Sequence, residues 1–181
     1  MPADLEFTEI RTARLVIRRF RAADAAAFAA YRSDRGVARY QSWDAYTLHD
    51  AEAFVKEMAA LHPGVPGEWF QFAVANLASD ELVGDVAACV HADDLSRAEL
   101  GFTLAPRHQG KGYAAEAVRA VIAYAFERLG VETVFGIADA RNDASVALLE
   151  RVGMRRTTTE HVQFKGEWCD EYTYELRRDD A

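Results

Sequence analysis

The residues best suited to chemistry form one loop, Arg107-His108-Gln109-Gly110-Lys111-Gly112-Tyr113-Ala114, just before an expected helix. The first turn of a helix carries unpaired N–H groups and partial positive charge. Two glycines let the backbone turn sharply, so that successive N–H groups can face one anion. The loop also holds three basic side chains and no acid, in a chain whose net charge is -8. This combination predicts a diphosphate site.

Two other interpretations of the loop remain open. It can be a glycine turn that only joins a strand to a helix. The run from Gly110 to Ala115 also fits G-x-G-x-x-A, a loose dinucleotide fingerprint, and Asp139 ends the next expected strand, where a ribose-binding acid belongs. Against the dinucleotide interpretation, the spacing from Gly112 to Asp139 exceeds the usual ~20 residues. The motif also lies late in the chain, and only one βαβ unit is expected where that fold has several.

The loop must be positioned by a strand before it and a helix after it. A strand is expected over Glu99–Leu104, and Ala114–Leu129 carries apolar residues at helical spacing on one stripe. A second strand is expected over Thr133–Ala138, and Asn142 can cap a helix over Ala144–Val152. This βαβ crossover should be right-handed, with its two strands parallel.

The rest of the chain predicts a mostly antiparallel sheet, because strand-like runs are separated by short turns. The further expected strands are Leu15–Phe20, Trp69–Asn76, Leu82–His91, Met154–Phe164 and Glu167–Leu176, and the further helices are Ala22–Tyr31 and Leu48–Leu61. The segment Arg32–Thr47 is expected to be an irregular loop. Its Tyr40, Trp43 and Tyr46 either line a substrate mouth or cover the core. The element order indicates an α+β or mixed α/β fold, in a single domain over residues 1–181.

Composition excludes several classes of function. The net charge of -8 argues against a nucleic-acid-binding surface, and it suits either a cationic substrate or solubility alone. Cys89 and Cys169 lie far apart and outside any CxxC pattern, so neither a disulfide framework nor a metal site is expected. Met1–Leu15 does not have the pattern of a signal peptide, and no apolar run reaches the roughly 18 residues of a membrane span. A cytoplasmic protein without membrane partners is therefore expected.

Several motifs resemble one enzyme family. Arg107-x-x-Gly110-x-Gly112 resembles the R/Q-x-x-G-x-G/A signature of the GCN5-related N-acetyltransferases (GNAT). Within that family, the sequence is similar to the RimJ/RimL-type branch, which acetylates ribosomal-protein N-termini. The segments that carry this second resemblance are Glu99-Leu100-Gly101-Phe102, Gly112-Tyr113-Ala114-Ala115-Glu116-Ala117, Asn142-x-x-Ser145 with Leu149-Glu150-Arg151-Val152-Gly153-Met154, Arg14-Leu15-x-x-Arg18 with Asp24, and Gly166-Glu167-Trp168-x-Asp170-Glu171.

The resemblance implies acetyl-CoA as a co-substrate, bound between two parallel strands that splay apart. Those strands would be the expected Glu99–Leu104 and Thr133–Ala138, in a mixed, mostly antiparallel sheet flanked by helices. Splaying leaves backbone groups unpaired for the pantetheine amides, and Asn142 would hydrogen-bond the pantetheine. The implied coenzyme residues are the main chain of Phe102, Thr103 and Leu104, and, around the pyrophosphate, Arg107, Gln109, Gly110, Lys111, Gly112, Tyr113 and Ala114. The resemblance is also compatible with a homodimer.

The implied reaction moves an acetyl group from a thioester to a primary amine, and it needs a base more than an acid. About one alkyl amine in a thousand is neutral at pH 7, whereas the leaving thiolate has a pKa of roughly 8.5. Glu99 lies where the family often has an acid, so it is the expected base, acting through a water. Otherwise it is a strand-end charge that pairs with Arg97. Ser145 is expected to protonate the sulfur, or else it caps or packs in the first turn of a helix.

The sequence departs from the family pattern at Leu149, where many relatives carry a tyrosine general acid. A tyrosine acid at that place is therefore excluded. The expected acceptor is an N-terminal peptide amine, with a small polyamine, amino acid or antibiotic as the other candidates. An acyl-CoA-binding protein without turnover is the alternative of a different class, and Leu149 favours it. His91 and His161 are expected to be packed or surface residues rather than bases.

Overall fold

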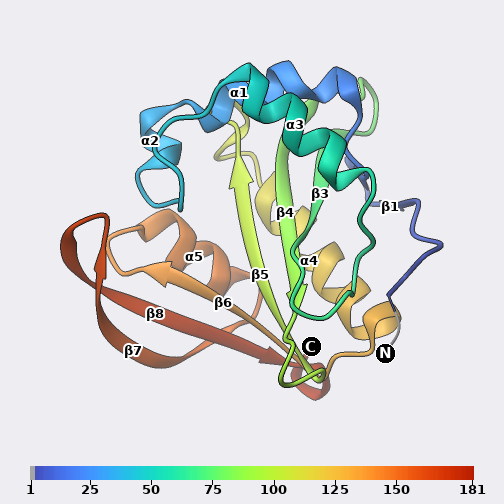
Figure 1. Cartoon of the computed structure of the whole chain (residues 1–181). Helices are drawn as coiled ribbons and strands as arrows, with labels where there is room; N and C mark the ends of the chain where they lie inside the picture. The colour runs from blue at the N-terminus through green and yellow to red at the C-terminus, as the bar shows by residue number, and fades with distance from the viewer. Residues whose placement is uncertain (1–2) are drawn as a thin grey trace.

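The computed structural model describes residues 3–181, which form one eight-stranded sheet with helices on both faces (Figure 1). The strand order is β1-β2-β3-β4-β5-β6-β8-β7. Neighbouring strands are antiparallel except for β5 and β6, which are parallel. The strands are β1 (Glu9–Arg11), β2 (Leu15–Arg18), β3 (Phe70–Asn76), β4 (Leu82–Val90), β5 (Arg97–Leu104), β6 (Thr133–Asp139), β7 (Arg155–Phe164) and β8 (Glu167–Arg177). The predicted mixed, mostly antiparallel fold is confirmed.

The helices divide between the two faces of the sheet (Figure 1). The α-helices are α1 (Ala25–Arg32), α2 (Arg35–Ala38), α3 (Leu48–Met58), α4 (Tyr113–Tyr124) and α5 (Asp143–Arg151). The apolar stripe of α4 packs with the inward-facing side chains of the sheet and with α5 in the larger core. A smaller core, rich in aromatic and alanine side chains, lies under α1 and α3 on the other face. The predicted crossover thus puts α4 and α5 together on one side.

The parallel pair β5–β6 separates soon after it forms. Its register covers only Arg97↔Thr133, Ala98↔Val134 and Glu99↔Phe135. Beyond Glu99, β5 continues to Leu104 paired with β4 alone, while β6 continues to its end paired with β8. A gap therefore opens between the two strands, with one edge of each left without a ladder partner.

Three local differences separate the structure from the sequence-based prediction. The strand β1 was not expected, because three residues with two charges give no apolar alternation. The expected loop Arg32–Thr47 contains the short helix α2, which the Asp34 side chain caps by accepting from the N–H groups of Gly36 and Val37. The long helix keeps α-helical bonding only to Tyr124 and then continues as a π-helical turn, Ala125–Leu129. Each difference depends on local hydrogen bonding rather than on hydrophobic periodicity.

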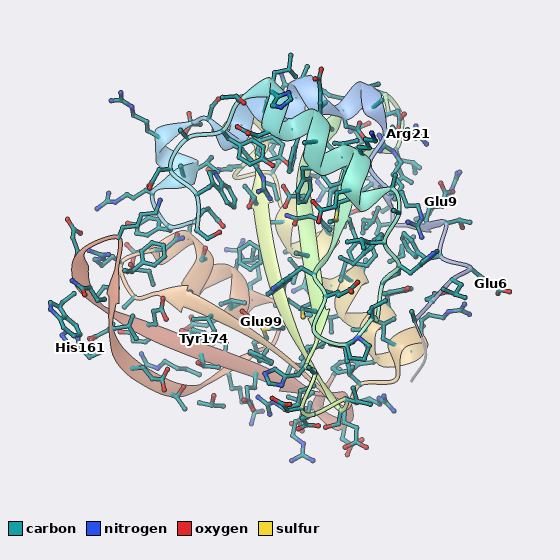
Figure 2. All side chains as sticks on the ribbon, in the orientation of Figure 1. Glu6, Glu9, Arg21, Glu99, His161 and Tyr174 are labelled. Atoms are coloured by element: carbon teal, nitrogen blue, oxygen red, sulfur yellow. The ribbon has the colours of Figure 1, made fainter. Side chains whose placement is uncertain are left out.

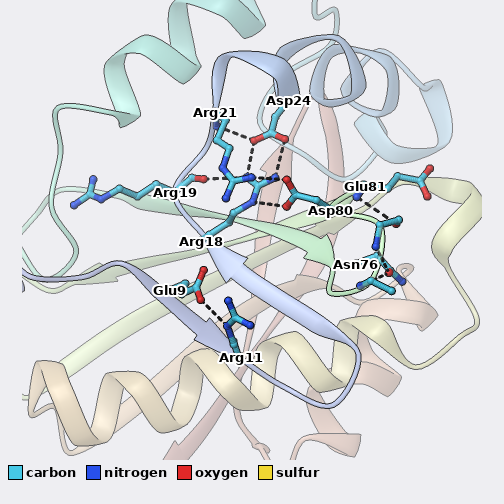
Figure 3. Close-up of polar contacts among 11 residues, drawn as sticks. Glu9, Arg11, Arg18, Arg19, Arg21, Asp24, Asn76, Asp80 and Glu81 are labelled. Carbon is cyan, nitrogen blue, oxygen red and sulfur yellow. Dashed lines mark hydrogen bonds and ion pairs between the residues drawn. The ribbon is translucent and has the colours of Figure 1, made fainter.

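A buried ionic cluster fixes the start of the chain's first helical segment (Figure 3). The guanidinium of Arg18 is buried, and it donates to both carboxylate oxygens of Asp24 at 2.8 and 3.0 Å. Its Nε donates to Asp80 in the β3–β4 turn at 3.0 Å, and Asp80 also pairs with Arg21. Such a bidentate pair fixes geometry as well as charge. Arg18 and Asp24, which belong to the first of the resembling segments in chain order, therefore connect β2, the start of α1 and the β3–β4 turn.

Candidate active site

A cleft of about 470 Å³ opens where β5 ends and α4 begins. Its walls come from the end of β5, the glycine loop, the first turns of α5 and the short helix α2. The predicted coenzyme residues that line it are Phe102, Thr103, Leu104, Gln109, Gly110, Gly112, Tyr113, Ala114, Asn142 and Ser145. Segments that range in the chain from Gly36 to Arg151 thus meet around one cavity.

The glycine loop has the backbone geometry expected for an anion site. Gly110 and Gly112 have φ angles of +72° and +80°, a region that side chains other than glycine rarely adopt. Gly112 is the N-cap of α4, and its position carries no side-chain cap. The first N–H groups of α4 therefore remain available to an acceptor from outside the helix, at its positive end. These features fit the diphosphate of a coenzyme.

Two predicted pyrophosphate residues lie outside the cleft lining. Arg107 forms an ion pair with Glu81 at 2.8 Å and also donates to the His108 ring at 3.1 Å. Lys111 lies on the outer side of the loop, where its carbonyl accepts from Arg14 at 3.0 Å. The loop sequence holds no acid, but the fold brings Glu81 to it from the start of β4, so part of its positive charge is neutralised.

The end of β5 presents its main chain to the gap. Thr103 is buried, and it lies opposite Asp85 in the antiparallel register of β4 and β5. The Leu104 carbonyl accepts from the Gln109 side chain at 3.0 Å, so this amide ties the glycine loop to the strand that precedes it. The backbone groups of Phe102 to Leu104 that point toward β6 have no strand partner there. They are placed to pair with the amides of an extended ligand.

Asn142 and Ser145 lie on the opposite wall of the cleft. Asn142 is the N-cap of α5, as predicted, because its Oδ1 accepts from the Ser145 N–H at 3.2 Å. Capping uses the side-chain oxygen, so the amide NH₂ is the group left to donate to a ligand carbonyl. The half-buried Ser145 lines the same cleft.

Glu99 lies where the two strands part, on the face opposite to α4 and α5. Its neighbours Ala98 and Leu100 are buried in the core under α4, so the intervening side chain points to the other face. Figure 2 places Glu99 near the middle of the view, where β5 and β6 lie next to each other. The ion pair with Arg97, which was the alternative to the role of Glu99 as base, is not formed, because Arg97 pairs with Glu175 at 2.5 Å.

The surroundings of Glu99 shift the pKa of its carboxyl. Burial raises the pKa of this carboxyl above its usual value, nearby Glu171 raises it further, and His91 opposes the shift. A carboxylate with a raised pKa is a stronger base than an exposed one. Two histidines on strand-like segments were expected not to act as bases. His91 is an exposed residue beside Phe135, and His161 stacks on Trp168 in the β7–β8 hairpin (Figure 2). Both are surface residues, as predicted.

The segment that contains α2 supplies another wall of the cleft. Gly36, Val37, Tyr40 and Gln41 line the cleft. Tyr40 also donates to the Arg141 carbonyl at 3.2 Å, so α2 is tied to the loop between β6 and α5. Of the expected aromatic cluster, Tyr40 is therefore part of the cleft, whereas Trp43 and Tyr46 pack around the buried Arg32 guanidinium.

One face of α5 also lines the cleft, and periodicity could have identified it. The residues on this face are Ala144, Ala147, Leu148 and Arg151, which repeat at helical spacing with Ser145. Leu149 points elsewhere: it is 1% exposed, and its side chain would meet a Cβ built on Gly136 at 3.0 Å. A tyrosine acid is absent at this position, as the sequence shows, and an apolar contact between α5 and β6 takes its place.

The dinucleotide interpretation is wrong. Asp139, its candidate ribose-binding acid, is held by Arg141 through Nη2 and the backbone N–H, at 2.7 and 2.8 Å. The sheet also contains one parallel pair rather than a doubly wound set. Within residues 3–181, no group of three or more His, Cys, Asp or Glu side chains is placed to hold a metal ion. No helix in the same range is long and apolar enough to cross a membrane.

Comparison with known proteins identifies the class. The family model for the acetyltransferase (GNAT) domain matches residues 14–155. The uncharacterized N-acetyltransferase YnaD of Bacillus subtilis (strain 168) is 30% identical over 169 residues, which cover 92% of this chain and 95% of that protein. A GNAT-family acetyltransferase structure from Bacillus anthracis has a TM-score of 0.84 at 28% identity, over 95% of this chain and 99% of the other.

A structure from Vibrio cholerae, assigned provisionally as a ribosomal-protein-serine acetyltransferase, has a TM-score of 0.79 at 28% identity, over 95% of this chain and 98% of the other. The chain therefore belongs to the GNAT acetyltransferase family, and it is an N-acetyltransferase. Enzymes of this family use acetyl-CoA as the acetyl donor and amines as acceptors. In this chain, the glycine loop at the head of α4 and the end of β5, beyond its short pairing with β6, border the same cleft.

Proposed function

We propose that this chain is an acetyl-CoA-dependent N-acetyltransferase of the RimJ/RimL type, which transfers acetyl to a primary amine by direct attack. The observation that carries the proposal is the gap between β5 and β6, which starts at Glu99 and leads to the glycine loop. In this proposal the coenzyme residues are those predicted from the sequence, with Arg107 and Lys111 acting at longer range than the others. Residues 1–181 act as one catalytic domain.

The two faces of the sheet have different roles in this proposal. The glycine loop, α4 and α5 hold the coenzyme on one side, and Glu99 points to the other. Bound acetyl-CoA supplies an activated thioester carbonyl. An amine that enters from the Glu99 side meets that carbonyl across the gap. This arrangement supports direct attack, because donor and acceptor approach from opposite faces.

Glu99 is the proposed general base, and it accepts the amine proton through a water. Its raised pKa suits this role, because burial by its neighbours strengthens it as a base. A backbone N–H on β5, in the part that lacks a parallel partner, binds the developing oxyanion. Ser145 is the proposed donor of a proton to the leaving sulfur, since it faces the cleft from α5 and Leu149 carries no acidic group.

An N-terminal peptide amine is the first proposed acceptor. The provisional assignment of the Vibrio cholerae structure supports it, since that protein is similar in sequence as well as in fold. A small polyamine is the second candidate. The charge of Glu171, on β8, acts on Glu99, and two neighbouring acidic side chains favour a cationic acceptor.

The first test is a calorimetric titration with acetyl-CoA, with NADH as the control ligand. We expect micromolar binding of acetyl-CoA and none of NADH. A Gly112→Glu variant, with an acid and a side chain at a φ of +80°, should lose acetyl-CoA binding. Normal acetyl-CoA binding by that variant would refute the loop assignment.

The second test measures thiol release with a peptide that has a free N-terminus and with the same peptide N-acetylated. Release with the free peptide alone supports the peptide acceptor. Release with spermidine and not with the peptide supports the polyamine. Acetyl-CoA binding without release for any amine would favour the coenzyme-binding protein without turnover.

A further inference from the structure

The turn between β1 and β2 lies against the first turn of α4, although about a hundred residues separate the two segments. The Glu116 carboxylate receives three hydrogen bonds from this turn. Its Oε1 accepts from the Thr12 hydroxyl at 2.6 Å and from the Arg14 backbone N–H at 2.9 Å. Its Oε2 accepts from Arg14 Nε at 2.7 Å. The N-terminal hairpin is thereby attached to the helix that begins at the glycine loop.

Arg14 also reaches the glycine loop directly. Its Nη1 donates to the Lys111 carbonyl at 3.0 Å, and its guanidinium lies over the Tyr113 ring at 4.7 Å. Its Nη2 lies 3.3 Å from the place that a Cβ on Gly112 would occupy. One side chain therefore contacts three consecutive residues, 111–113, at the point where the backbone turns into α4.

The position of Glu116 makes this contact electrostatically important. An acid in the first turn stabilises a helix, but here it stands at the end that an incoming diphosphate has to approach. Burial opposes ionisation of Glu116, yet hydrogen bonds from Thr12 and Arg14 outweigh it and hold the pKa of this carboxyl below its usual range. Glu116 is thus a carboxylate, and the Arg14 guanidinium is the cation that compensates it.

We propose that Arg14 is a positioning residue for coenzyme binding. It fixes the Lys111 carbonyl and Gly112 so that the loop N–H groups face the diphosphate, and it cancels the Glu116 charge beside them. This role rests on the proposed coenzyme site. It also gives a physical reason for the arginine of the segment Arg14-Leu15-x-x-Arg18, which lies 97 positions before Lys111 of the glycine loop.

The test replaces Arg14 by methionine, which keeps an apolar stem and removes the guanidinium. Because charged hydrogen bonds are lost near the anion, we expect the Kd for acetyl-CoA to rise about tenfold or more. The kcat at saturating acetyl-CoA should stay within about twofold, since Arg14 is remote from Glu99. The matched control is Arg11→Met, which removes an exposed Arg–Glu pair on β1 (Figure 3) and should leave both constants unchanged.

A second variant separates positioning from general stabilisation. In Arg14→Met the Glu116 carboxylate is left uncompensated, so adding Glu116→Gln should restore part of the lost acetyl-CoA affinity. A double variant that binds no better than Arg14→Met would overturn the charge-cancelling role, because a loss of packing alone is not relieved by removing a charge. Arg14→Lys keeps the charge but cannot contact Glu116 and Lys111 together, so its affinity should lie between the wild type and Arg14→Met.

The outcomes also distinguish this proposal from the proposed function. If the wild type fails to bind acetyl-CoA, the coenzyme site is wrong, and the role of Arg14 fails with it. If the wild type binds and Arg14→Met binds within about twofold of it, only the role of Arg14 is refuted. If Arg14→Met does not fold, Arg14→Lys decides, and wild-type affinity in that variant overturns the proposal.

Discussion

Replacing Gly84 by alanine tests how closely β4 must approach β5, the strand that is proposed to bind the coenzyme. A Cβ at Gly84 would lie closer than 3.0 Å to the Thr103 carbonyl oxygen and 2.9 Å from the Leu104 Cα, and real Cβ atoms do not show such separations. Overpacking of this kind costs about 1–3 kcal/mol. Replacing a strand glycine by alanine offsets about 0.5–1 kcal/mol of that cost. Both nearest atoms belong to the backbone and cannot rotate away, so the upper half of the overpacking range applies, and the net loss of unfolding free energy should be about 1–2.5 kcal/mol.

For a chain of this size, that loss corresponds to a fall in Tm of about 2–10 °C. Gly101→Ala on the facing strand is the matched control. Its Cβ would find only Ala87 at 3.9 Å and Trp69 at 4.0 Å, which are ordinary contacts, so its Tm should be unchanged or slightly higher. Thermal unfolding of both variants measures this difference. A Gly84→Ala protein that melts at or above the wild-type temperature would refute the close-approach argument.

Because Thr103 and Leu104 also provide main chain to the cleft, the same substitution should weaken acetyl-CoA binding. Calorimetric titration at a temperature where both variants are folded measures this effect. We expect Gly84→Ala to bind acetyl-CoA several-fold more weakly, and Gly101→Ala to bind it about as tightly as the wild type. Equal affinity in the two variants would mean that the strand backbone does not contribute to the site.

Three further predictions concern single side chains. Glu99→Gln should lower kcat by about 10²–10⁴-fold with little change in acetyl-CoA affinity, and nearly full thiol release would contradict its role as base. Since burial raises the Glu99 pKa, wild-type kcat/KM should fall as pH drops through a value above that of an ordinary glutamate, and the variant should lack this limb. Asp85→Ala should cost about 3–5 kcal/mol in urea unfolding, because it leaves the buried Arg32, 3.6 Å away, without its carboxylate; a loss under about 1 kcal/mol would be inconsistent with this. Leu149→Tyr should lower the unfolding free energy by about 1–3 kcal/mol without raising kcat, since no space exists against Gly136, and a gain in kcat would show that an acid can be accommodated there.

The sequence predicted the regular elements of the fold because their hydrophobic patterns are strong. The start of α4 and both ends of β3 and β4 were placed to within one residue, and the predicted helix end at Leu129 is the end of the π-helical turn that follows α4. The parallel pairing of β5 and β6 followed from the crossover between them. The strand β1 and the helix α2 were missed, because each is held by a few hydrogen bonds and by tertiary contacts that leave no periodic signal.

The parts of the candidate site that depend on backbone conformation were predicted well. The parts that depend on contacts between side chains far apart in the sequence were predicted less well. Gly110 and Gly112 indicate a sharp turn by their type alone, and the structure gives both a positive φ. By contrast, Arg107 looked available, yet it pairs with Glu81, which lies 26 positions earlier in the chain. The resemblance identified Arg14 as part of a motif, but only the fold shows that it contacts the loop around Gly112. Long-range ion pairs of this kind cannot be derived from one sequence without the fold.

The short register of β5 with β6 divides the sheet into two mechanical units. One consists of β1 to β5 and the other of β6, β8 and β7, and along the sheet only three residue pairs, Arg97 to Glu99 with Thr133 to Phe135, join them. A ligand in the gap would bond to both units at once and would complete a connection that the strands leave unfinished. Occupancy of the gap would thereby set the rigidity of the whole sheet, so that the enzyme would be stiffest when the donor is bound and most deformable once the product has left.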